Sequence, residues 1–515
     1  MMADWLKNSV FYEVYPQSFM DSNSDGIGDL TGIVTKLDYI KDLGCNAIWL
    51  NPIFDSPFMD AGYDVRDYTK IAPRYGTMED FLHLLDMAHQ KGLRILLDLV
   101  PGHTSDTHKW FQMAKRAERN EFSDRYIFTN SVWDAPVEYR LMCGITPRDG
   151  NYLVNYFSSQ PALNYGFYDV KYPSWQRSSD SEEAWDTVEA LKDVMCFWLD
   201  KGIDGFRVDM ADSLVKNDNE KIATAKIWRS IRQMMDERYP EAVLISEWSD
   251  PLRAIVNAGF HADFYLDHQG NGYNALFRMK RGDENLSFFA DNAHGDIDAF
   301  LSDYLPAYNC SKDKGYISFI TNNHDMPRAP FYMSDEIIKL SHAFIMTMPG
   351  VPFVYYGDEI GMRYRTDLVS KEGGYSRTGS RTPMQWNEGK NKGFSDADED
   401  MLYLPIDLSE DAPTVESQKG REGSIYENLR TLIYIRRENP ELMNDSDFEV
   451  VYAKHNEYPF VYRRGSFTVF VNPSSECHTV DYALNGARVK YSIGGFEITD
   501  HTVILHQKSF LLIKH

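Results

Sequence analysis

The chain has 515 residues, of which 43% are hydrophobic and 25% are charged, a composition typical of a globular protein with a large core. Its formal net charge of −24 argues against a nucleic acid or an anionic membrane as partner, because both need basic surfaces. No run of about 18 apolar residues occurs, and the N-terminus lacks a basic stretch followed by an apolar one. Five scattered cysteines without a Cys-x-x-Cys pair are typical of free thiols in a reducing compartment. We therefore expect a cytoplasmic protein.

Short apolar segments alternate with longer amphipathic stretches through most of the chain. The stretches Met78–Lys91 and Glu183–Asp200 predict two of the helices. Such alternation favours an α/β fold. Within that class it favours a parallel (β/α)8 barrel of the TIM type over an open sheet. The predicted barrel strands are Phe11–Tyr15, Ala47–Leu50, Arg94–Leu99, Gly205–Asp209, Leu244–Glu247, Phe264–Leu266, Ile317–Thr321 and Phe353–Tyr356.

Two regions break this alternation. Residues 104–172 are rich in Tyr, Asn and Pro without a clean repeat, which predicts a domain inserted after the third strand. From Asn439 onwards the apolar pattern has period two, which predicts a C-terminal antiparallel β-sandwich domain over 439–515. The barrel then consists of residues 1–103 and 173–438. The predicted C-terminal strands are Phe448–Tyr452, Phe460–Arg463, Phe467–Val471, Val489–Ser492 and Thr502–Leu505.

A loop near the N-terminus, Asp21-Ser-Asn-Ser-Asp-Gly-Ile-Gly-Asp29, places oxygen-bearing side chains at alternate positions. It begins as an EF-hand loop does, but Gly32 stands where the bidentate Glu would be. We expect a structural calcium or magnesium ion here and no organic cofactor. A tight turn without an ion is the alternative. The predicted ligands are Asp21, Asn23, Asp25, the carbonyl of Ile27 and Asp29.

Three of the predicted barrel strands lead into a carboxylate: Asp209, Glu247 and Asp325. The C-terminal ends of barrel strands share one rim, so we expect these acids to face a common site. A charge at such a position is costly unless it is paired or used. Hydrolysis of an acetal needs one ionised carboxylate as nucleophile and one protonated carboxyl as acid. The three acids fit that chemistry better than three separate salt bridges.

The neighbours of two acids suggest different protonation states. Arg207 lies two residues before Asp209, on the same face of the strand, and is expected to lower its pKa and hold it ionised. Glu247 follows an apolar strand and precedes Trp248, surroundings expected to raise its pKa and keep it protonated. Asp209 is therefore the candidate nucleophile and Glu247 the candidate general acid.

Other polar residues are expected on the same rim. His324 precedes Asp325, a carboxylate able to bind sugar hydroxyls, and His103 follows the third predicted strand. Tyr63 and Asp64 follow the second strand and add an aromatic face beside a carboxylate. Each alone is commonly structural, but their coincidence on one rim favours a functional interpretation.

With these motifs, the chain resembles the α-amylase superfamily of retaining glycoside hydrolases, in particular its oligo-1,6-glucosidase and α-glucosidase branch. The matching motifs run from the Asp21 loop to Arg381-Thr-Pro-Met-Gln-Trp386. The resemblance implies the barrel, the inserted domain and the C-terminal β domain. It also implies Asp209 as nucleophile, Glu247 as acid/base and Asp325 as transition-state stabiliser. The same resemblance implies that the subsite for the cleaved glucose is lined by His103, Arg207 and His324.

Two further segments point to the branch. Gln160-Pro-Ala-Leu-Asn164 resembles its inserted-domain signature, with Ala162 in place of the usual Asp. Arg377-Thr-Gly-Ser-Arg381 resembles a segment whose first arginine, with the residue matching Asp64, binds the non-reducing end of the terminal glucose. Both arginines are therefore expected at the substrate site. An ion pair that closes the site beyond one sugar implies a pocket and cleavage from the chain end.

Three departures from the family pattern limit these expectations. Gly102 replaces the Asn that normally precedes the third-strand His, which puts in doubt the calcium site that some amylases build there. Met210, after the nucleophile, is neither the Val associated with α-1,6 cleavage nor the Ala or Thr associated with α-1,4, so linkage preference is open. The charged Arg-Leu-Asp-Arg-Asp loop of sucrose isomerases is absent, which disfavours isomerase activity.

The expected function is that of a retaining, exo-acting α-glucosidase on short α-glucosides, namely malto- or isomalto-oligosaccharides or sucrose. The alternative is a glucosyl transferase or isomerase with the same catalytic residues. A barrel retained as a non-enzymatic subunit, as in the heavy chains of amino-acid transporters, is disfavoured because those proteins carry a membrane helix and have lost catalytic acids. The only partner expected is the small sugar substrate, and the sequence leaves open a monomer or a homo-oligomer.

Overall fold

Eight parallel strands close into a barrel in the computed structural model, which describes residues 3–292, 294–484 and 486–515. The strand order around the barrel is β1-β14-β13-β10-β9-β8-β5-β2. All eight strands were predicted, although the sixth lies two residues earlier than expected. Residues 1, 2, 293 and 485 of the predicted domains lie outside the described residues. The strands are β1 (Phe11–Val14), β2 (Ala47–Leu50), β5 (Arg94–Leu99), β8 (Gly205–Val208), β9 (Val243–Ser246), β10 (Ala262–Phe264), β13 (Tyr316–Phe319) and β14 (Val351–Tyr355).

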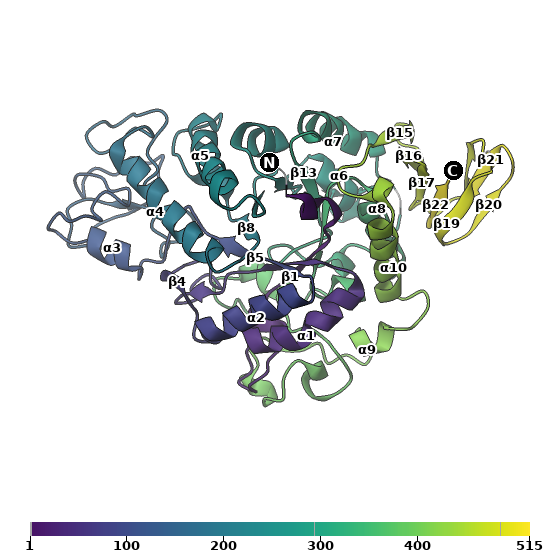
Figure 1. Cartoon of the computed structure of the whole chain (residues 1–515), viewed down its shortest axis with the longest axis horizontal. Coiled ribbons are helices and arrows are strands. Elements are labelled where there is room, and N and C mark those ends of the chain that lie inside the picture. The colour runs from purple at the N-terminus through teal and green to yellow at the C-terminus, as the bar shows by residue number, and fades with distance from the viewer. Residues whose placement is uncertain (1–2, 293, 485) are drawn as a thin grey trace.

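Helices surround these strands (Figure 1) and begin where the sequence supplies caps. The side chain of Asp29 accepts a hydrogen bond from the backbone of Gly32 at the start of α1. Thr77 and Asp80 form a capping box at the start of α2. In the described part of the chain, no helix combines the length and apolarity needed to cross a membrane. The helices are α1 (Leu30–Leu43), α2 (Met78–Gln90), α3 (Lys109–Ala114), α4 (Glu182–Leu199), α5 (Ile222–Arg238), α6 (Gly272–Phe277), α7 (Ile297–Ser311), α8 (Asp335–Thr347), α9 (Val415–Gln418) and α10 (Ile425–Glu438), with a π-helical turn at Leu252–Ala258.

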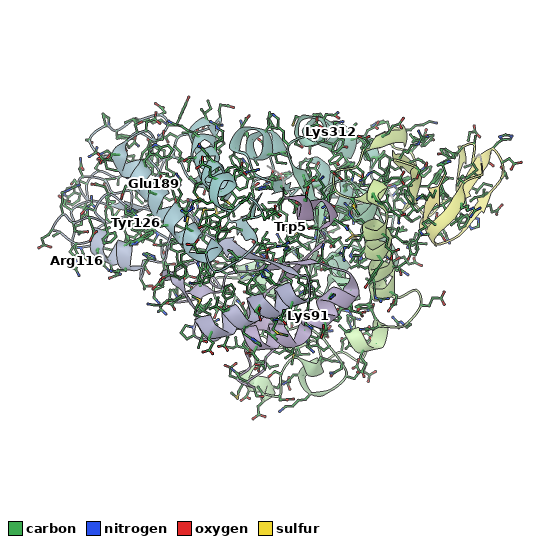
Figure 2. The ribbon with its side chains drawn as sticks, in the orientation of Figure 1. Trp5, Lys91, Arg116, Tyr126, Glu189 and Lys312 are labelled. Atoms are coloured by element: carbon green, nitrogen blue, oxygen red, sulfur yellow. The ribbon has the colours of Figure 1, made fainter. Side chains whose placement is uncertain are left out.

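The segment between β5 and α4 has little regular structure and forms the left end of the molecule in Figure 1. Buried aromatic residues hold it together. Tyr126, labelled in Figure 2, packs edge-on against Phe111 and shares a 2.7 Å hydrogen bond with the hydroxyl of Thr104. This confirms an insertion after the third barrel strand. Because α4 begins at Glu182, the irregular segment extends beyond the expected limit, and the boundary at 172 stays a prediction. Its only strands in the described residues are β6 (Leu141–Met142) and β7 (Tyr152–Leu153).

The C-terminal region packs a five-stranded antiparallel sheet on a three-stranded one, which confirms the predicted β-sandwich. Three of its strands were not predicted: β18, β20 and β22. β22 is a continuous apolar run because it is buried on both faces. Phe510 and Leu512 pack into the core shared with the barrel, whereas Leu511 and Ile513 pack between the two sheets. The strands are β15 (Glu449–Tyr452), β16 (Phe460–Arg464), β17 (Phe467–Asn472), β18 (His478–Asp481), β19 (Arg488–Ile493), β20 (Phe496–Ile498), β21 (Thr502–Leu505) and β22 (Ser509–Lys514).

Two small hairpins lie outside the barrel sheet and the C-terminal sandwich. β3 (Phe54–Asp55) pairs with β4 (Asp67–Ile71) just after β2, and β11 (Lys280–Arg281) pairs with β12 (Glu284–Asn285) after α6. The first hairpin shapes the loop that carries Tyr63 and Asp64. It therefore belongs to the rim on which the candidate site lies.

Candidate active site

A cavity of about 340 Å³ opens at the C-terminal rim of the barrel. Its volume is at the lower end of the range for small-molecule sites. The three predicted catalytic acids line it, together with several predicted sugar-binding residues. The structure therefore brings together residues that lie up to 317 positions apart in the sequence. The lining residues are Asp60, Tyr63, His103, Tyr156, Asp209, Met210, Glu247, Asp325 and Arg377.

One guanidinium group connects three carboxyl groups on one side of the cavity. Arg207 is 1% exposed, and its Nη1 lies 2.9 Å from Asp98 Oδ1 and 3.0 Å from Asp209 Oδ1. Its Nη2 lies 2.9 Å from Glu247 Oε2. Arg207 and Asp209 share a strand face, as predicted, but the cation does not serve Asp209 alone. A single positive charge is divided among three acids.

The protonation of Asp209 differs from the expectation. Burial raises its pKa well above the usual range, and the nearby Glu247 carboxylate raises it further, while Arg207 only partly opposes them. The predicted lowering is therefore wrong. Burial also raises the pKa of Asp98 to about 6, against the opposing effects of Arg207 and His324. Carboxyl groups this close titrate together, so the cluster retains a proton more readily than isolated acids do.

The expected surroundings of Glu247 also need correction. Its side chain does not end in an apolar pocket. Glu247 Oε2 accepts a 2.9 Å hydrogen bond from the backbone N–H of Met210 and contacts Arg207. Met210 has a left-handed backbone with φ of 41°, which points its N–H at the carboxyl group while its side chain lines the cavity. Glu247 is thus oriented by hydrogen bonds and not by apolar packing.

On the other side of the cavity, cations outnumber carboxylates. Asp325 Oδ1 lies 3.0 Å from Arg377 Nη1 and 2.9 Å from Arg381 Nη2. Its Oδ2 lies 3.0 Å from His324 Nε2. Burial opposes the charged form, but the His324 and arginine charges outweigh it and hold the pKa of Asp325 well below its usual range. Asp325 therefore stays ionised.

Tyr63 lies between the two sides. Its hydroxyl is 2.9 Å from Asp98 Oδ2 and 2.7 Å from His324 Nε2. The ring stacks on that of His324, with centroids 5.4 Å apart. Its expected aromatic face is thus at the site, and its hydroxyl links the Arg207 cluster to the Asp325 cluster.

His103 is held by both ring nitrogens. Nε2 lies 3.0 Å from the carbonyl oxygen of Tyr63, and Nδ1 lies 3.2 Å from Asn155 Nδ2. Asn155 Oδ1 in turn accepts a hydrogen bond from Lys216 Nζ at 3.1 Å. A Cβ at Gly102 would lie 2.7 Å from Asn155 Nδ2. Where the family pattern has an Asn, this chain therefore has a gap that Asn155 of the inserted segment fills, with the Lys216 ammonium beside it.

Arg377 pairs with a different acid from the expected one. Its Nη2 lies 3.1 Å from Asp60 Oδ1. Asp64 is completely buried and accepts hydrogen bonds from the hydroxyl of Ser56 and the backbone N–H groups of Met59 and Asp60. The expected Arg377–Asp64 pair is wrong, because the Asp64 carboxylate is hydrogen-bonded within its own loop. Asp60, four residues earlier, reaches the cavity instead.

In the predicted metal loop, the side-chain oxygens accept hydrogen bonds largely from the backbone of the loop itself. Asp21 and Asp29 accept several backbone N–H groups, and Asp21 Oδ2 also accepts the hydroxyl of Ser395. Asn23 and Asp25 each accept the N–H two residues ahead. The three carboxylates are not among the groups of described residues whose ligand atoms all lie within 4.8 Å. The oxygen donors suit a hard cation, and the ion stays a prediction.

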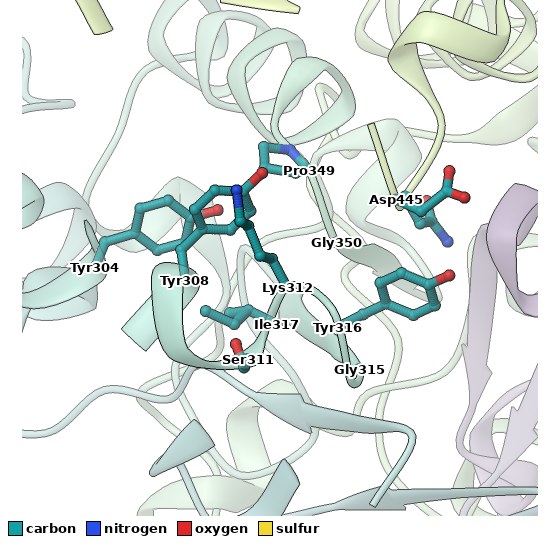
Figure 3. A pocket seen from close by; sticks show the side chains of 11 residues that line it. Tyr304, Tyr308, Ser311, Lys312, Gly315, Tyr316, Ile317, Pro349, Gly350 and Asp445 are labelled. Carbon is teal, nitrogen blue, oxygen red and sulfur yellow. The ribbon is translucent and has the colours of Figure 1, made fainter. Parts of the chain in front are cut away.

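A second, much smaller cavity lies at the other end of the barrel. Figure 3 shows it between Tyr304, Lys312, Tyr316 and Pro349. Tyr316 begins β13, so this cleft faces the N-terminal end of the strands. Its volume of about 10 Å³ holds roughly one water molecule. It has no room for a sugar.

Several residues of the site were not predicted. Asp98 was recognisable as a charge inside the apolar strand Arg94–Leu99, and Lys216 as a cation seven residues beyond the nucleophile. Asp60 competed with Asp64 in the same loop, and nothing in the sequence distinguished them. Asn155 and Tyr156 come from the irregular segment, where no periodic pattern indicates which side chains face the cavity.

Comparison with known proteins agrees with this architecture. Residues 13–445 match the α-amylase catalytic domain. The trehalose synthase/amylase of Mycolicibacterium smegmatis is 34% identical over 84% of this chain and 76% of its own length. The glucan 1,6-alpha-glucosidase of Streptococcus pneumoniae is 30% identical over 92% of each chain. The crystal structure of the trehalulose synthase of Pseudomonas mesoacidophila superposes with a TM-score of 0.79 at 24% identity, over 99% of each chain, and shows the shared fold. The chain therefore belongs to the α-amylase family of glycoside hydrolases.

Proposed function

We propose that this protein is an exo-acting, retaining α-glucosidase that hydrolyses short α-glucosides. The observation that carries the proposal is the placement of Arg377, which contacts both Asp60 and Asp325 in the wall of a cavity of about 340 Å³. A pocket walled by such a pair suits the end of a sugar chain. A polysaccharide bound along its middle would need an open groove instead.

The geometry around Arg207 supports a double displacement. Asp209 attacks the anomeric carbon while the bond between that carbon and the leaving oxygen breaks. Glu247 donates a proton to the leaving oxygen. Glu247 then takes a proton from a water that attacks the same carbon. The carbon–oxygen bond to Asp209 breaks, which releases α-glucose and restores both acids. The raised pKa of Asp209 fits a cluster of carboxyl groups that retains a proton, and the proposed reaction needs that proton on Glu247.

Ionised Asp325 is suited to accept hydrogen bonds from sugar hydroxyls. His103 and Tyr63 add further polar contacts to the same cavity. Malto- and isomalto-oligosaccharides and sucrose are the proposed substrates. The glucan 1,6-alpha-glucosidase relative supports an α-1,6 linkage among them. Met210 lines the cavity beyond the nucleophile and is placed to influence the linkage.

Glucosyl transfer is the second candidate, and one observation favours it. The relative from Mycolicibacterium smegmatis is named a trehalose synthase as well as an amylase. In transfer, a sugar hydroxyl replaces water in the second step, and the same residues act. An isomerase retains the released sugar and bonds it again to the glucosyl group.

We also propose a structural calcium or magnesium ion in the Asp21–Asp29 loop. Oxygen donors at alternate positions support it. The ion would lie in the loop that precedes α1, and no step of the reaction depends on it.

Product analysis tests the function directly. Maltose, isomaltose, sucrose and a maltoheptaose are incubated with the protein, and the initial products are identified by NMR and chromatography. The proposal expects glucose released from chain ends, initially as the α-anomer. Internal fragments of the heptaose would contradict exo action, and initial β-glucose would contradict retention. New disaccharides as the main products would establish transfer or isomerisation instead.

A further inference from the structure

Glu13 is a completely buried acid on β1 that contacts the active site without lining the cavity. Its Oε1 lies 2.8 Å from His324 Nδ1, and both side chains are 0% exposed. Asn51 Nδ2 also lies 3.3 Å from Glu13 Oε1. Glu13 Oε2 has no hydrogen-bond partner among the described residues. A buried carboxylate with so few donors needs a cation beside it.

The contacts of His324 determine where its protons are. A carboxylate only accepts hydrogen bonds, so Nδ1 carries a proton toward Glu13. Asn51 Nδ2 also lies 3.1 Å from Nδ1, but its two protons have acceptors in Glu13 Oε1 and the Tyr63 hydroxyl. Nε2 faces Asp325 Oδ2 at 3.0 Å and the hydroxyl of Tyr63 at 2.7 Å. The Tyr63 hydroxyl donates to Asp98 Oδ2 at 2.9 Å, which leaves its oxygen as an acceptor. Nε2 therefore also carries a proton, and both nitrogens donate only in the imidazolium form.

We propose that Glu13 is a positioning residue that keeps His324 as an imidazolium, through which it supports the charge and orientation of Asp325. Glu13, His324 and Asp325 form a line of alternating charges from the barrel interior to the cavity. Glu13 touches neither the cavity nor the reacting atoms, so its effect is exerted through His324. This role deepens the proposed function and rests on Asp325 contacting the sugar.

The other charges near His324 do not replace Glu13. Asp325 acts from the next residue, and Asp98 on β5 acts through Tyr63. Arg381 donates to the backbone carbonyl of His324, which does not involve the ring. Burial opposes the imidazolium, but Asp325 and Glu13 together outweigh it and raise the pKa of His324 to about 9. Without the Glu13 charge, His324 would lose its proton at a lower pH.

Replacement Glu13→Gln tests the role with little change of shape. If the pKa of His324 falls from about 9 toward the ordinary value near 6.5, the imidazolium fraction at pH 8 falls by up to about 30-fold. We expect kcat/KM of the variant to fall by a similar factor at pH 8 and to return to within about threefold of wild type near pH 5.5. The alkaline limb of the pH profile should move down by at least about one unit.

Glu359→Gln is the matched control. Glu359 is equally buried, has one oxygen without a partner among the described residues, and accepts hydrogen bonds from Tyr12 and Tyr39 instead of a histidine. Its variant should keep the wild-type alkaline limb. An equal shift in both variants, or an unshifted limb in a folded Glu13→Gln protein, would overturn the proposal. Circular dichroism and thermal melts establish that both variants fold.

An NMR measurement on the wild-type protein needs neither activity nor a stable variant. Histidine labelled with nitrogen-15 reports each ring nitrogen, and the His324 signals are assigned by their loss in His324→Asn. The proposal expects both nitrogens protonated at pH 8. A neutral ring at that pH would refute it. Imidazolium signals together with no glucosidase activity would support this charge arrangement while refuting the proposed function.

Discussion

Asp209 and Asp325 each follow a barrel strand on the same rim, yet their charge environments are opposite. Asp209 shares the single cation of Arg207 with Asp98 and Glu247, and its pKa is raised. Asp325 contacts three cationic side chains, His324, Arg377 and Arg381, and its pKa is lowered. The number of cations per carboxylate, rather than position at a strand end, distinguishes them. The Arg207 side of the pocket therefore favours protonation of its carboxyl groups, whereas the Asp325 side favours a fixed negative charge.

The largest expected effect comes from the proton-holding side. Asp209→Asn removes the proposed nucleophile and should lower turnover by roughly four to six orders of magnitude. Asp212→Asn is a suitable control, because Asp212 is three residues away and pairs with Lys221 outside the cavity lining. Initial rates of glucose release measure both. An Asp209→Asn protein with activity near that of the control would disprove the assignment of the nucleophile.

Arg377→Ala weakens the other side. It leaves Asp325 with two cationic partners and Asp60 without its ion pair. We expect kcat/KM on maltose to fall roughly 30- to 1,000-fold, the cost of removing one member of a buried charge pair. Activity on maltoheptaose should fall less, since an opened pocket admits longer chains. Arg363→Ala, which breaks an exposed pair with Asp411, serves as control. Equal losses on both substrates would argue against Arg377 as a closing residue.

The charge of Asp60, the partner of Arg377, should make substrate binding depend on pH. Burial raises its pKa to about 6 even though Arg377 opposes it, so Asp60 loses its charge as the pH falls through about 6. KM for maltose should therefore rise below pH 6 in the wild type. In Asp60→Asn we expect KM to be about tenfold higher at neutral pH and to change less between pH 5 and 7 than in the wild type. The remaining change is expected from Asp98, whose pKa is also about 6. A pH dependence of KM as large as that of the wild type would contradict the role of Asp60.

A smaller effect is expected at His103. Asn155→Ala removes the hydrogen bond to its Nδ1 and the acceptor of Lys216. The loss of one such bond predicts a fall in kcat/KM of roughly three- to tenfold. Asn130→Ala, an exposed position of the same segment, should leave the rate unchanged. A fall equal in both variants would mean that the segment as a whole had been disturbed.

The proposed ion is expected to affect stability and not the rate. If it binds, a chelator should lower the Tm of the wild type by about 2–5 °C, while Asp25→Asn should lose that sensitivity. Differential scanning calorimetry with calcium, with magnesium and with chelator measures the shift. A wild-type Tm that is the same under all three conditions would rule out the proposed site.

The sequence predicted the barrel and the three acids that line its cavity because buried parallel strands are apolar runs and a terminal acid interrupts them. The same signal occurs at Asp209 and Asp325, so it could not reveal their different pKa values. Burial opposes the charge of both acids, and Glu247 raises the pKa of Asp209 further, whereas His324, Arg381 and Arg377 lower the pKa of Asp325. The glutamate and the two arginines come from other segments of the chain. The sequence did not indicate a role for Glu13, because it lies within the predicted strand Phe11–Tyr15 and not at the end of a strand. Asp60 and Asp64 show a further limit of prediction from sequence. Only the folded loop determines which of the two acids forms hydrogen bonds within the loop and which one lines the cavity.

The gap at Gly102 has a consequence for recombination between relatives. Asn155 from the inserted segment occupies the volume that a side chain at position 102 would need. A side chain at position 102 would displace the Asn155 amide, and this barrel joined to a segment without Asn155 would leave His103 Nδ1 without that contact. The two parts therefore form a matched pair that must be exchanged together. Chimeras that swap only one of them should lose activity that the double exchange restores.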